Sequence, residues 1–265
     1  MTGVSIPFHS GANASERHKR LGIVWPDTGE ALEQFEMASP SRLNSFASGN
    51  LEFAFGYSRV PPGHDVEVLE RVAEAGGTAD AGRKLAYAGA DAVVWACTSG
   101  SFIGGLAKAK TQLRDLQGRI GVPVTTAALA LMSAADRLGL QKIDILSPYP
   151  MDVSGIFRDF MEDAGFEVVS LLPLGSPCAS ASASLDLIEE CRPLASMPGE
   201  AIIIPDTATN TLGNVAELET AAGKPVLTVN QACLFEGALL AGARDAVAGI
   251  PALRRLADTS AMGAT

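Results

Sequence analysis

The sequence predicts an α/β protein with two pseudo-symmetric domains, each with a central parallel sheet flanked by helices, and an active site in the cleft between them. One observation is that short apolar runs alternate with longer helix-compatible segments along all 265 residues, the pattern of parallel strands joined by helical crossovers. Another is that residues 93–102 and 201–211 share one layout: an apolar strand, one reactive residue, then small hydroxyl or amide residues. The reactive residues are Cys97 and Asp206.

Further similarities repeat in the same order along the chain. Residues 21–27 resemble 143–149, and residues 121–126 resemble 223–228. Strand-loop-helix units also resemble one another by chance, so the repeat is a hypothesis that the sequence favours. It predicts a first domain over 21–126 plus 228–265 and a second domain over 127–227. Residues 1–20 are polar and lack periodicity, which predicts a flexible leader. If the halves face each other, Cys97 and Asp206 flank one cleft.

The first half is expected to hold four strands, near residues 21–25, 51–60, 93–97 and 123–125. Asp27 either touches a ligand or caps a helix that begins near Glu30. Residues 66–88 are helical, with a break at the adjacent glycines 76 and 77. A helix is expected to follow the Cys97 strand to about residue 117, and another over 126–138 to lead into the second half.

The second half is expected to hold strands near 142–147, 167–174, 201–204 and 226–228. The helix after the first of these carries a core stripe at helical spacing, made of Val153, Ile156, Phe157, Phe160 and Met161. Small residues over 175–182 suit a mobile loop, in which Cys178 is interpreted as incidental. Further helices are expected at 184–192, 214–222 and 230–248, and the last can return the chain to the first half.

Composition excludes several functional classes. No apolar run approaches the length that spans a bilayer, and the N-terminus lacks the apolar core of a signal peptide, which predicts a cytoplasmic protein. The four cysteines are widely spaced without a CxxC pair, so neither a disulfide framework nor a zinc site is expected. A net charge of −10 argues against nucleic acid and membranes as partners. A small carboxylate substrate and a homo-oligomer both remain compatible with the sequence.

Each reactive residue has a structural interpretation beside the chemical one. Cys97 stands where open α/β sheets place ligand sites, and the N–H groups of the next helix favour a carboxylate or a thiolate there. The structural interpretation is that Cys97 is only a small buried residue, as free cysteines often are. Partial burial of Asp206 would raise its pKa toward that of a useful acid or base. Asp206 followed by Thr207 also fits a helix N-cap, which would lower that pKa. His64, in a turn, is expected to be solvated.

These residue types suit chemistry at a carbon next to a carboxylate. Such chemistry needs a group that takes or gives a proton and donors that hold the enediolate oxygens. Two half-sites on opposite faces let a proton leave one face and enter the other without a cofactor. The thiolate could also attack a double bond and let the product rotate before release.

Four segments carry a resemblance to a known family: 93–102, 145–152, 202–212 and 225–231. Over roughly residues 21–244 the sequence resembles the aspartate/glutamate racemase superfamily, in the branch of maleate cis-trans isomerases and arylmalonate decarboxylases. The resemblance implies two pseudo-symmetric domains, an active site between them, and neither cofactor nor metal. Racemases and isomerases of this family usually carry cysteine at both half-sites, whereas the decarboxylases keep only the second and have glycine at the first. With Cys97 and Asp206, this chain departs from both patterns.

The family pattern also implies the pocket. Its carboxylate-binding residues would be Thr98, Ser99, Tyr149, Thr207 and Ala208, and its first loop would be Trp25, Pro26 and Asp27. The Ser-Asn-Thr-Thr type of loop found in maleate isomerases is replaced by residues 27–30, Asp-Thr-Gly-Glu, which disfavours maleate. The charge of Asp206 favours a substrate with an amine, amidine or ring nitrogen besides its carboxylate, and a branch found among ectoine-utilisation proteins fits such a substrate.

Three functions therefore compete. The first is a cofactor-independent racemase or isomerase in which Cys97 and Asp206 act as opposed acid and base. The second is a decarboxylase or related lyase in which Cys97 protonates an enediolate. The third is a binding protein that retains the cleft without the chemistry.

Overall fold

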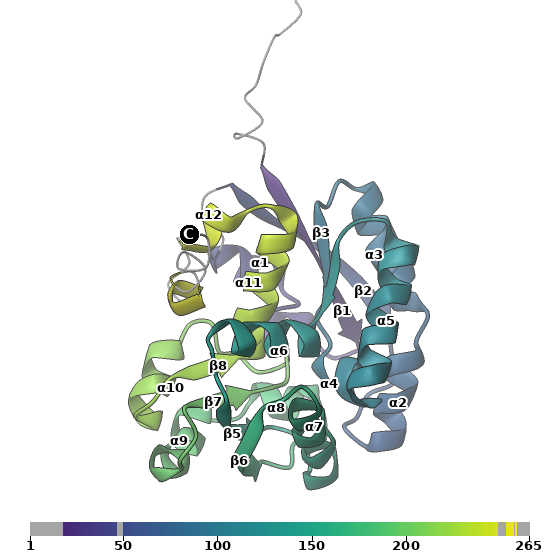
Figure 1. Cartoon of the computed structure of the whole chain (residues 1–265). Coiled ribbons are helices and arrows are strands. Elements are labelled where there is room, and N and C mark those ends of the chain that lie inside the picture. The colour runs from purple at the N-terminus through teal and green to yellow at the C-terminus, as the bar shows by residue number, and fades with distance from the viewer. Residues whose placement is uncertain (1–17, 47–49, 249–252, 257, 259–265) are drawn as a thin grey trace, which may run out of the picture.

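Two parallel sheets of equivalent topology organise the chain (Figure 1). The computed structural model describes residues 18–46, 50–248, 253–256 and 258. In the first sheet the strand order is β2-β1-β3-β4, with β1 at Lys19–Asp27, β2 at Leu51–Arg59, β3 at Ala92–Trp95 and β4 at Val124–Thr126. In the second it is β6-β5-β7-β8, with β5 at Lys142–Ser147, β6 at Glu167–Pro173, β7 at Ala201–Ile204 and β8 at Val226–Thr228. The predicted fold class is confirmed, and each predicted sequence repeat falls on an equivalent pair of strands.

Helices connect the strands within each lobe. The first lobe contains η1 (Leu32–Gln34), α1 (Pro40–Leu43), η2 (Asn44–Phe46), α2 (Val66–Glu74), α3 (Gly77–Tyr87), α4 (Thr98–Phe102), α5 (Gly105–Ile120) and α6 (Ala127–Arg137). After it come α7 (Met151–Asp163), α8 (Ala179–Ala183), α9 (Leu187–Cys191), η3 (Arg192–Ser196), α10 (Val215–Ala222), α11 (Val229–Ala241) and α12 (Arg244–Ala248). The repeat extends to helix ends: α5 and α10 both stop at a left-handed glycine, Gly121 and Gly223, which opens the turn into β4 or β8.

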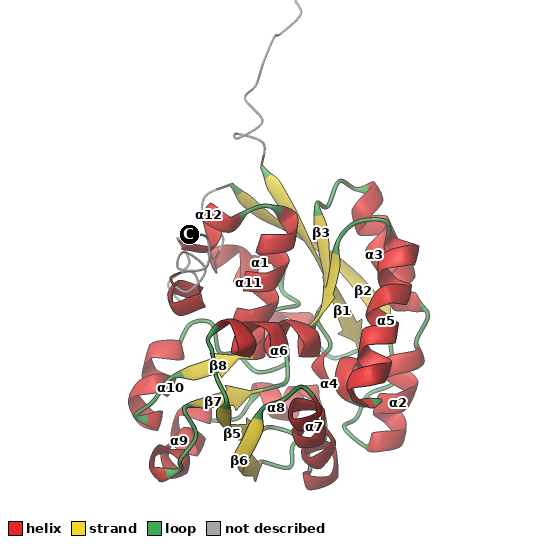
Figure 2. Cartoon of the chain, in the orientation of Figure 1, coloured by secondary structure: helices red, strands yellow, loops and turns green. Residues whose placement is uncertain are grey.

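Helices α6 and α11 join the two lobes (Figure 2). They pack against each other, and α11 also contacts β1, β3 and β4 of the first sheet, so the chain returns to the first lobe as predicted. Helix α11 is apolar on nearly every side and is largely buried, as its position between two sheets requires. Gly237 permits the close approach, because a Cβ atom there would lie 2.6 Å from Val94 and 2.7 Å from Leu21.

One core spans both lobes. The inward-facing residues of both sheets, including Ile23, Val94, Ile145 and Ile203, form a single apolar cluster with the helices between them. The outer faces have separate clusters, one beneath α3 and α5 and one beneath α9 and α10. Because the two sheets share their inner core, the strand ends that carry Cys97 and Asp206 are held on one rigid support.

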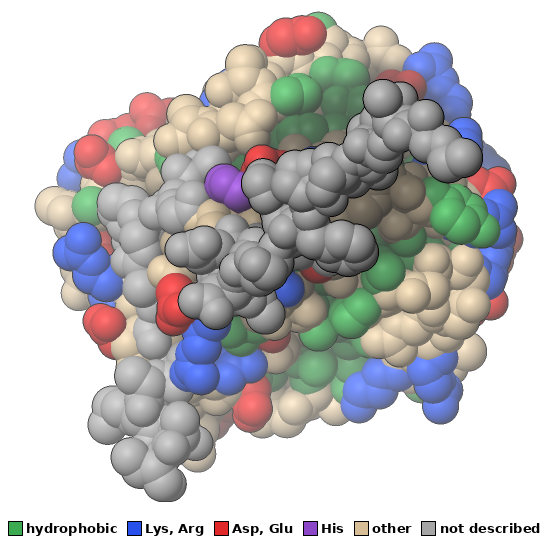
Figure 3. Space-filling model, turned by 90° about the horizontal axis from the view of Figure 1, so that it is seen from above, with side chains coloured by type: hydrophobic (Ala, Val, Ile, Leu, Met, Phe, Trp, Pro, Cys, Tyr) green, Lys and Arg blue, Asp and Glu red, His purple; other side chains and the backbone are tan. Residues whose placement is uncertain are grey.

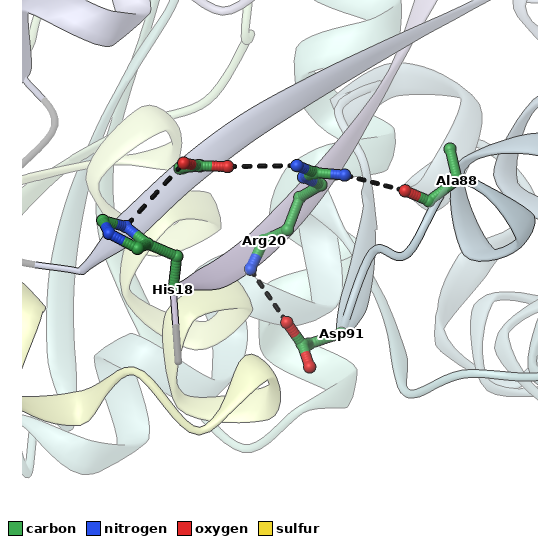
Figure 4. Close-up of polar contacts among 5 residues, drawn as sticks. His18, Arg20, Ala88 and Asp91 are labelled. Atoms are coloured by element: carbon green, nitrogen blue, oxygen red, sulfur yellow. Dashed lines mark hydrogen bonds and ion pairs between the residues drawn. The ribbon is translucent and has the colours of Figure 1, made fainter. Parts of the chain in front are cut away.

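The predicted leader ends too late. Its residues 1–17 lie outside the described chain, but Lys19 and Arg20 belong to β1, in register with Leu51 and Glu52. Arg20 donates from its backbone N to Asp91 at 2.9 Å and from its guanidinium to Ala88 at 2.7 Å (Figure 4). Polar side chains hid this strand end from the apolar pattern.

The α-helix expected to begin near Glu30 is not formed. The chain forms only the short η1 there, and Asp27 caps nothing: its Oδ1 accepts from the N–H of Gly29 at 2.9 Å and its Oδ2 pairs with Arg59 at 3.1 Å. Asp27 therefore fixes the loop after β1.

The surface shows mixed charge. On the face in Figure 3, acidic and basic side chains are interspersed around the rim with apolar ones between them. Within the described residues, no helix is long and apolar enough to cross a membrane, and no group of His, Cys, Asp or Glu is placed to hold a metal ion. The four cysteines are all unpaired.

The close approach at Gly237 can be tested by stability. We expect Gly237→Ala to lower the free energy of unfolding by about 1–3 kcal/mol, because the added methyl group overpacks the contact of α11 with β1 and β3. Gly155→Ala in α7 is the matched control: nothing lies within 4 Å of its Cβ position, so it should be neutral or stabilising by up to about 1 kcal/mol. Chemical denaturation measures both, and equal effects would contradict the packing role.

Candidate active site

Cys97 and Asp206 line one cavity between the lobes. They reach it from equivalent places, the carboxyl ends of β3 and β7, which is where parallel sheets place ligands. Its lining is Trp25, Pro26, Thr28, Val60, Pro61, Gly63, His64, Leu69, Val72, Cys97, Thr98, Ser99, Ala179, Asp206, Thr207 and Ala208. The volume is about 40 Å³, room for only a few water molecules. A substrate must therefore separate the lining segments as it binds.

Cys97 is a protonated thiol in this enclosed site. Cys97 is 4% exposed, and burial raises the pKa of its thiol to about 12. The N–H of Gly100 and the hydroxyl of Ser99 lower this pKa, whereas the charge of Asp206 raises it further. The N–H group of Gly100 favours the thiolate, as expected of a helix start, but desolvation outweighs this effect in the unliganded site. A Cβ atom at residue 100 would lie 3.0 Å from the sulfur, so glycine there lets the helix turn approach Cys97.

Asp206 occupies a backbone conformation that few residues adopt. Its φ is 79°, the only positive value at a described residue other than glycine. Asp tolerates this region when its side chain bonds locally, and Oδ1 accepts from the N–H of Ala208 at 3.1 Å. The expected N-cap is therefore only half present: the capping bond forms, but a turn rather than a helix follows. Oδ2 is buried and has no hydrogen-bond partner among the described residues.

The residues after Cys97 and Asp206 bind each other across the lobes. The backbone N–H of Thr207 donates to Oγ1 of Thr98 at 3.1 Å, and the hydroxyl of Thr207 donates to the carbonyl oxygen of Ala96 at 3.0 Å. Thr207 has thus used both of its donors, while the Thr98 hydroxyl keeps its own proton for another acceptor. Of these two threonines, Thr98 is the one that can donate to a substrate carboxylate.

Tyr149 lies just beneath this pair. Its ring is buried against Phe102 and His64, and its hydroxyl completes no hydrogen bond with a described residue. Burial raises its pKa well above the ordinary value, and the charges of Asp206 and Cys97 add to the rise, although the nearby hydroxyls of Thr98 and Ser99 lower it. The protonated hydroxyl of Tyr149 can therefore donate a hydrogen bond to an anionic oxygen of a ligand.

The structure brings most of the predicted residues together. Those that line the cavity with Cys97 and Asp206 are Trp25, Pro26, Thr98, Ser99, Thr207 and Ala208. Tyr149 lies behind the lining, and Asp27 is turned toward Arg59, with Thr28 in the cavity instead. The contribution of β2 and α2 was missed, because an apolar wall of Val60, Pro61, Leu69 and Val72 carries no motif. His64, expected to be solvated, is 6% exposed and belongs to this wall.

A buried carboxylate supports the Asp206 turn. Glu36 accepts from the N–H groups of Thr211 and Leu212 at 2.9 and 3.1 Å and from the amide of Asn230 at 2.6 Å. Asn230 also donates to the carbonyl oxygen of Thr209 at 2.7 Å, and Thr209 donates its hydroxyl to the carbonyl oxygen of Asp206 at 2.7 Å. Burial raises the pKa of Glu36, partly offset by these donors. No sequence signal marked Glu36, because its partners are distant in the chain.

Comparison with known proteins identifies a family. The family model described as arylmalonate decarboxylase matches residues 57–253. The arylmalonate decarboxylase of Bordetella bronchiseptica is 27% identical over 190 residues, which are 70% of this chain and 76% of that protein.

Solved structures share the fold. A maleate isomerase variant from Pseudomonas putida S16 with maleate has a TM-score of 0.76 at 21% identity, covering 90% of this chain and 97% of that one. A Nocardia farcinica maleate cis-trans isomerase mutant with a covalently bound succinylcysteine intermediate has a TM-score of 0.69 at 20% identity, covering 91% and 98%.

The electrostatic coupling of the two half-sites can be measured without a substrate. We expect Asp206→Asn to lower the pKa of Cys97, because it removes a negative charge that disfavours the thiolate. Alkylation by iodoacetamide at pH 9, resolved by residue with mass spectrometry, should then be faster at Cys97 than in the unmodified protein.

Controls for this experiment lie in the same chain. Cys233 is also buried with a raised pKa, from burial alone, and its alkylation rate should not change. Asp80→Asn, at an exposed residue outside the cavity, should leave the rate at Cys97 unchanged. An equal rate at Cys97 with and without the Asp206 charge would contradict the coupling.

Proposed function

This chain belongs to the arylmalonate decarboxylase family, and we propose that it is a cofactor-independent racemase or isomerase acting next to the carboxylate of a small acid. The family match and the folds shared with maleate isomerases support an enzyme that acts on carboxylates. One observation carries the proposal: the Cys97 thiol and the unpartnered Oδ2 of Asp206 reach a single cavity from opposite lobes.

The two groups have complementary protonation states. The Asp206 carboxylate accepts the proton of the substrate α carbon on one face, and the Cys97 thiol gives its proton to the other face. The pKa of about 12 keeps that proton on sulfur until the enediolate forms. The products are an inverted carbon, a protonated Asp206 and a Cys97 thiolate, and exchange with solvent restores the starting forms. No redox group is required.

Hydroxyl groups hold the developing charge. Thr98 and Ser99 line the cavity, and the nearby Tyr149 hydroxyl has no hydrogen-bond partner in the described part of the chain. Donors of this kind in a dry site stabilise an enediolate more strongly than they would in water. Among the described residues that line the cavity, none is Lys or Arg, so one substrate carboxylate can be neutralised only by such donors.

The substrate class follows from Asp206. Its buried negative charge repels a second carboxylate and attracts a cationic group, so the substrate carries a nitrogen group as well as its carboxylate. Nitrogen-containing acids of the kind used in ectoine utilisation belong to this class.

A decarboxylase is the second candidate. The observation that favours it is the protonated state of Cys97, because a thiol is what an enediolate needs after carbon dioxide has left. In that reaction the bond from the α carbon to one carboxylate breaks, its electrons form the enediolate, and the Cys97 proton completes the product.

Incubation in deuterated water with a panel of small acids separates the candidates. Deuterium at the α carbon without carbon dioxide release is the expected result, and release of carbon dioxide selects the lyase. Cys97→Ser and Asp206→Asn should each lower the rate at least about 100-fold, because each removes a proton-transfer group. Cys178→Ser, outside the cavity lining, is the matched control. Ligand binding that survives Cys97→Ser, with no turnover of any acid, would instead indicate a binding protein.

Asp206→Cys tests the substrate class. We expect the ratio of activity on amino acids to activity on dicarboxylates to fall roughly ten-fold or more, because the thiol carries no charge to repel a second carboxylate. Asp80→Asn removes a charge at an exposed position outside the cavity and should leave the ratio unchanged. An unaltered ratio in Asp206→Cys rules out the charge as its cause.

A further inference from the structure

Asp206 has too few free oxygens for the two tasks that its charge suggests. Oδ1 is engaged by the N–H of Ala208 at 3.1 Å, which leaves Oδ2 as the free atom. If Oδ2 takes the α proton, it cannot at the same time hold the nitrogen group of the substrate. A second acceptor in the same cavity would hold the nitrogen group and keep Oδ2 free for proton transfer.

His64 lines that cavity, and its ring is fixed in place. Its backbone N–H donates to the carbonyl oxygen of Pro177 at 2.9 Å, and its Nδ1 lies 2.9 Å from the carbonyl oxygen of Ser176. The ring lies in a T-shaped arrangement with that of Tyr149, at a centroid distance of 5.0 Å. Ser176 in turn donates its N–H to Pro148 at 2.8 Å, so the loop that holds the ring is itself held by the second lobe.

These contacts determine which ring nitrogen is free. A carbonyl oxygen can only accept, so Nδ1 must carry the proton in its bond to Ser176. In the neutral ring Nε2 is then an acceptor, and it has no hydrogen-bond partner among the described residues. Nε2 lies on the side of the ring away from Ser176, and the cavity is the open space that His64 borders.

We propose that His64 determines the specificity of this site: its Nε2 accepts a hydrogen bond from an ammonium group of the substrate and leaves Oδ2 of Asp206 free for proton transfer. The inference rests on the proposed function and names the ligand class more closely, an acid whose nitrogen carries a proton. Asp206 contributes the attracting charge and His64 the directed acceptor.

Matched ligands and matched variants test the assignment. The probes are alanine, β-alanine and 4-aminobutyrate, each against the acid with methyl in place of ammonium: isobutyrate, butyrate and pentanoate. By calorimetry at pH 8, the protein should bind at least one amino acid roughly ten-fold or more tightly than its partner.

Two substitutions then separate the ring nitrogens. His64→Asn keeps a donor near the Nδ1 position but removes the acceptor, and should lower that preference roughly ten-fold. His64→Gln places an amide near the Nε2 position and should retain part of the preference. His18→Asn, at an exposed residue, is the matched control. An equal preference in His64→Asn and the unmodified protein overturns the proposal, as does failure of all six acids to bind.

The ring itself gives a readout that needs no ligand. Nitrogen NMR at pH 8 should find the His64 proton on Nδ1, with the signal assigned by its loss in His64→Asn. A proton on Nε2 would make that atom a donor and overturn the proposal. The two proposals can fail separately. If the His64-dependent binding preference is found, also in Cys97→Ser, but no acid is turned over, only the proposed reaction fails. If acids are turned over without that binding preference, only the His64 assignment fails.

Discussion

The site depends on two hydrogen bonds that Thr207 makes across the lobes. Its backbone N–H bonds to Thr98 and its hydroxyl to the carbonyl oxygen of Ala96, so the segment after one reactive residue is fastened to the segment around the other. Each lobe alone presents a strand end with one reactive side chain. The paired threonines make those ends opposite walls of a single chamber, and the two sheets that carry them share an inner core.

Desolvation then sets the chemical character of the chamber. Cys97 remains a thiol and Tyr149 a phenol because burial disfavours their charged forms, and Asp206 repels a second negative charge near either. The described lining has neither Lys nor Arg, so hydroxyl protons do the work that cations do in other anion sites. The reaction that we propose uses this character: the Cys97 thiol gives a proton, the Asp206 carboxylate receives one, and excess negative charge is disfavoured.

Much of this architecture could be predicted from local sequence. Apolar runs predict all eight strands of the described chain, and the repeat pairs Cys97 with Asp206 from the sequence alone. What escaped prediction depends on contacts between distant residues. Nothing local distinguishes a solvated His64 from one enclosed by Ser176 and Tyr149, and a positive φ at Asp206 is a product of the turn around it. Glu36 gave no signal because its partners lie in the other lobe and in α11.

The long reach of Glu36 bears on biosynthesis. Its carboxylate bonds to Thr211, 175 positions later, and to Asn230, 194 positions later. While the ribosome is still synthesising the second lobe, Glu36 lacks these partners, and the Asp206 turn lacks the contacts that support it. The Glu36 contacts that support the Asp206 turn are therefore complete only once α11 has been synthesised.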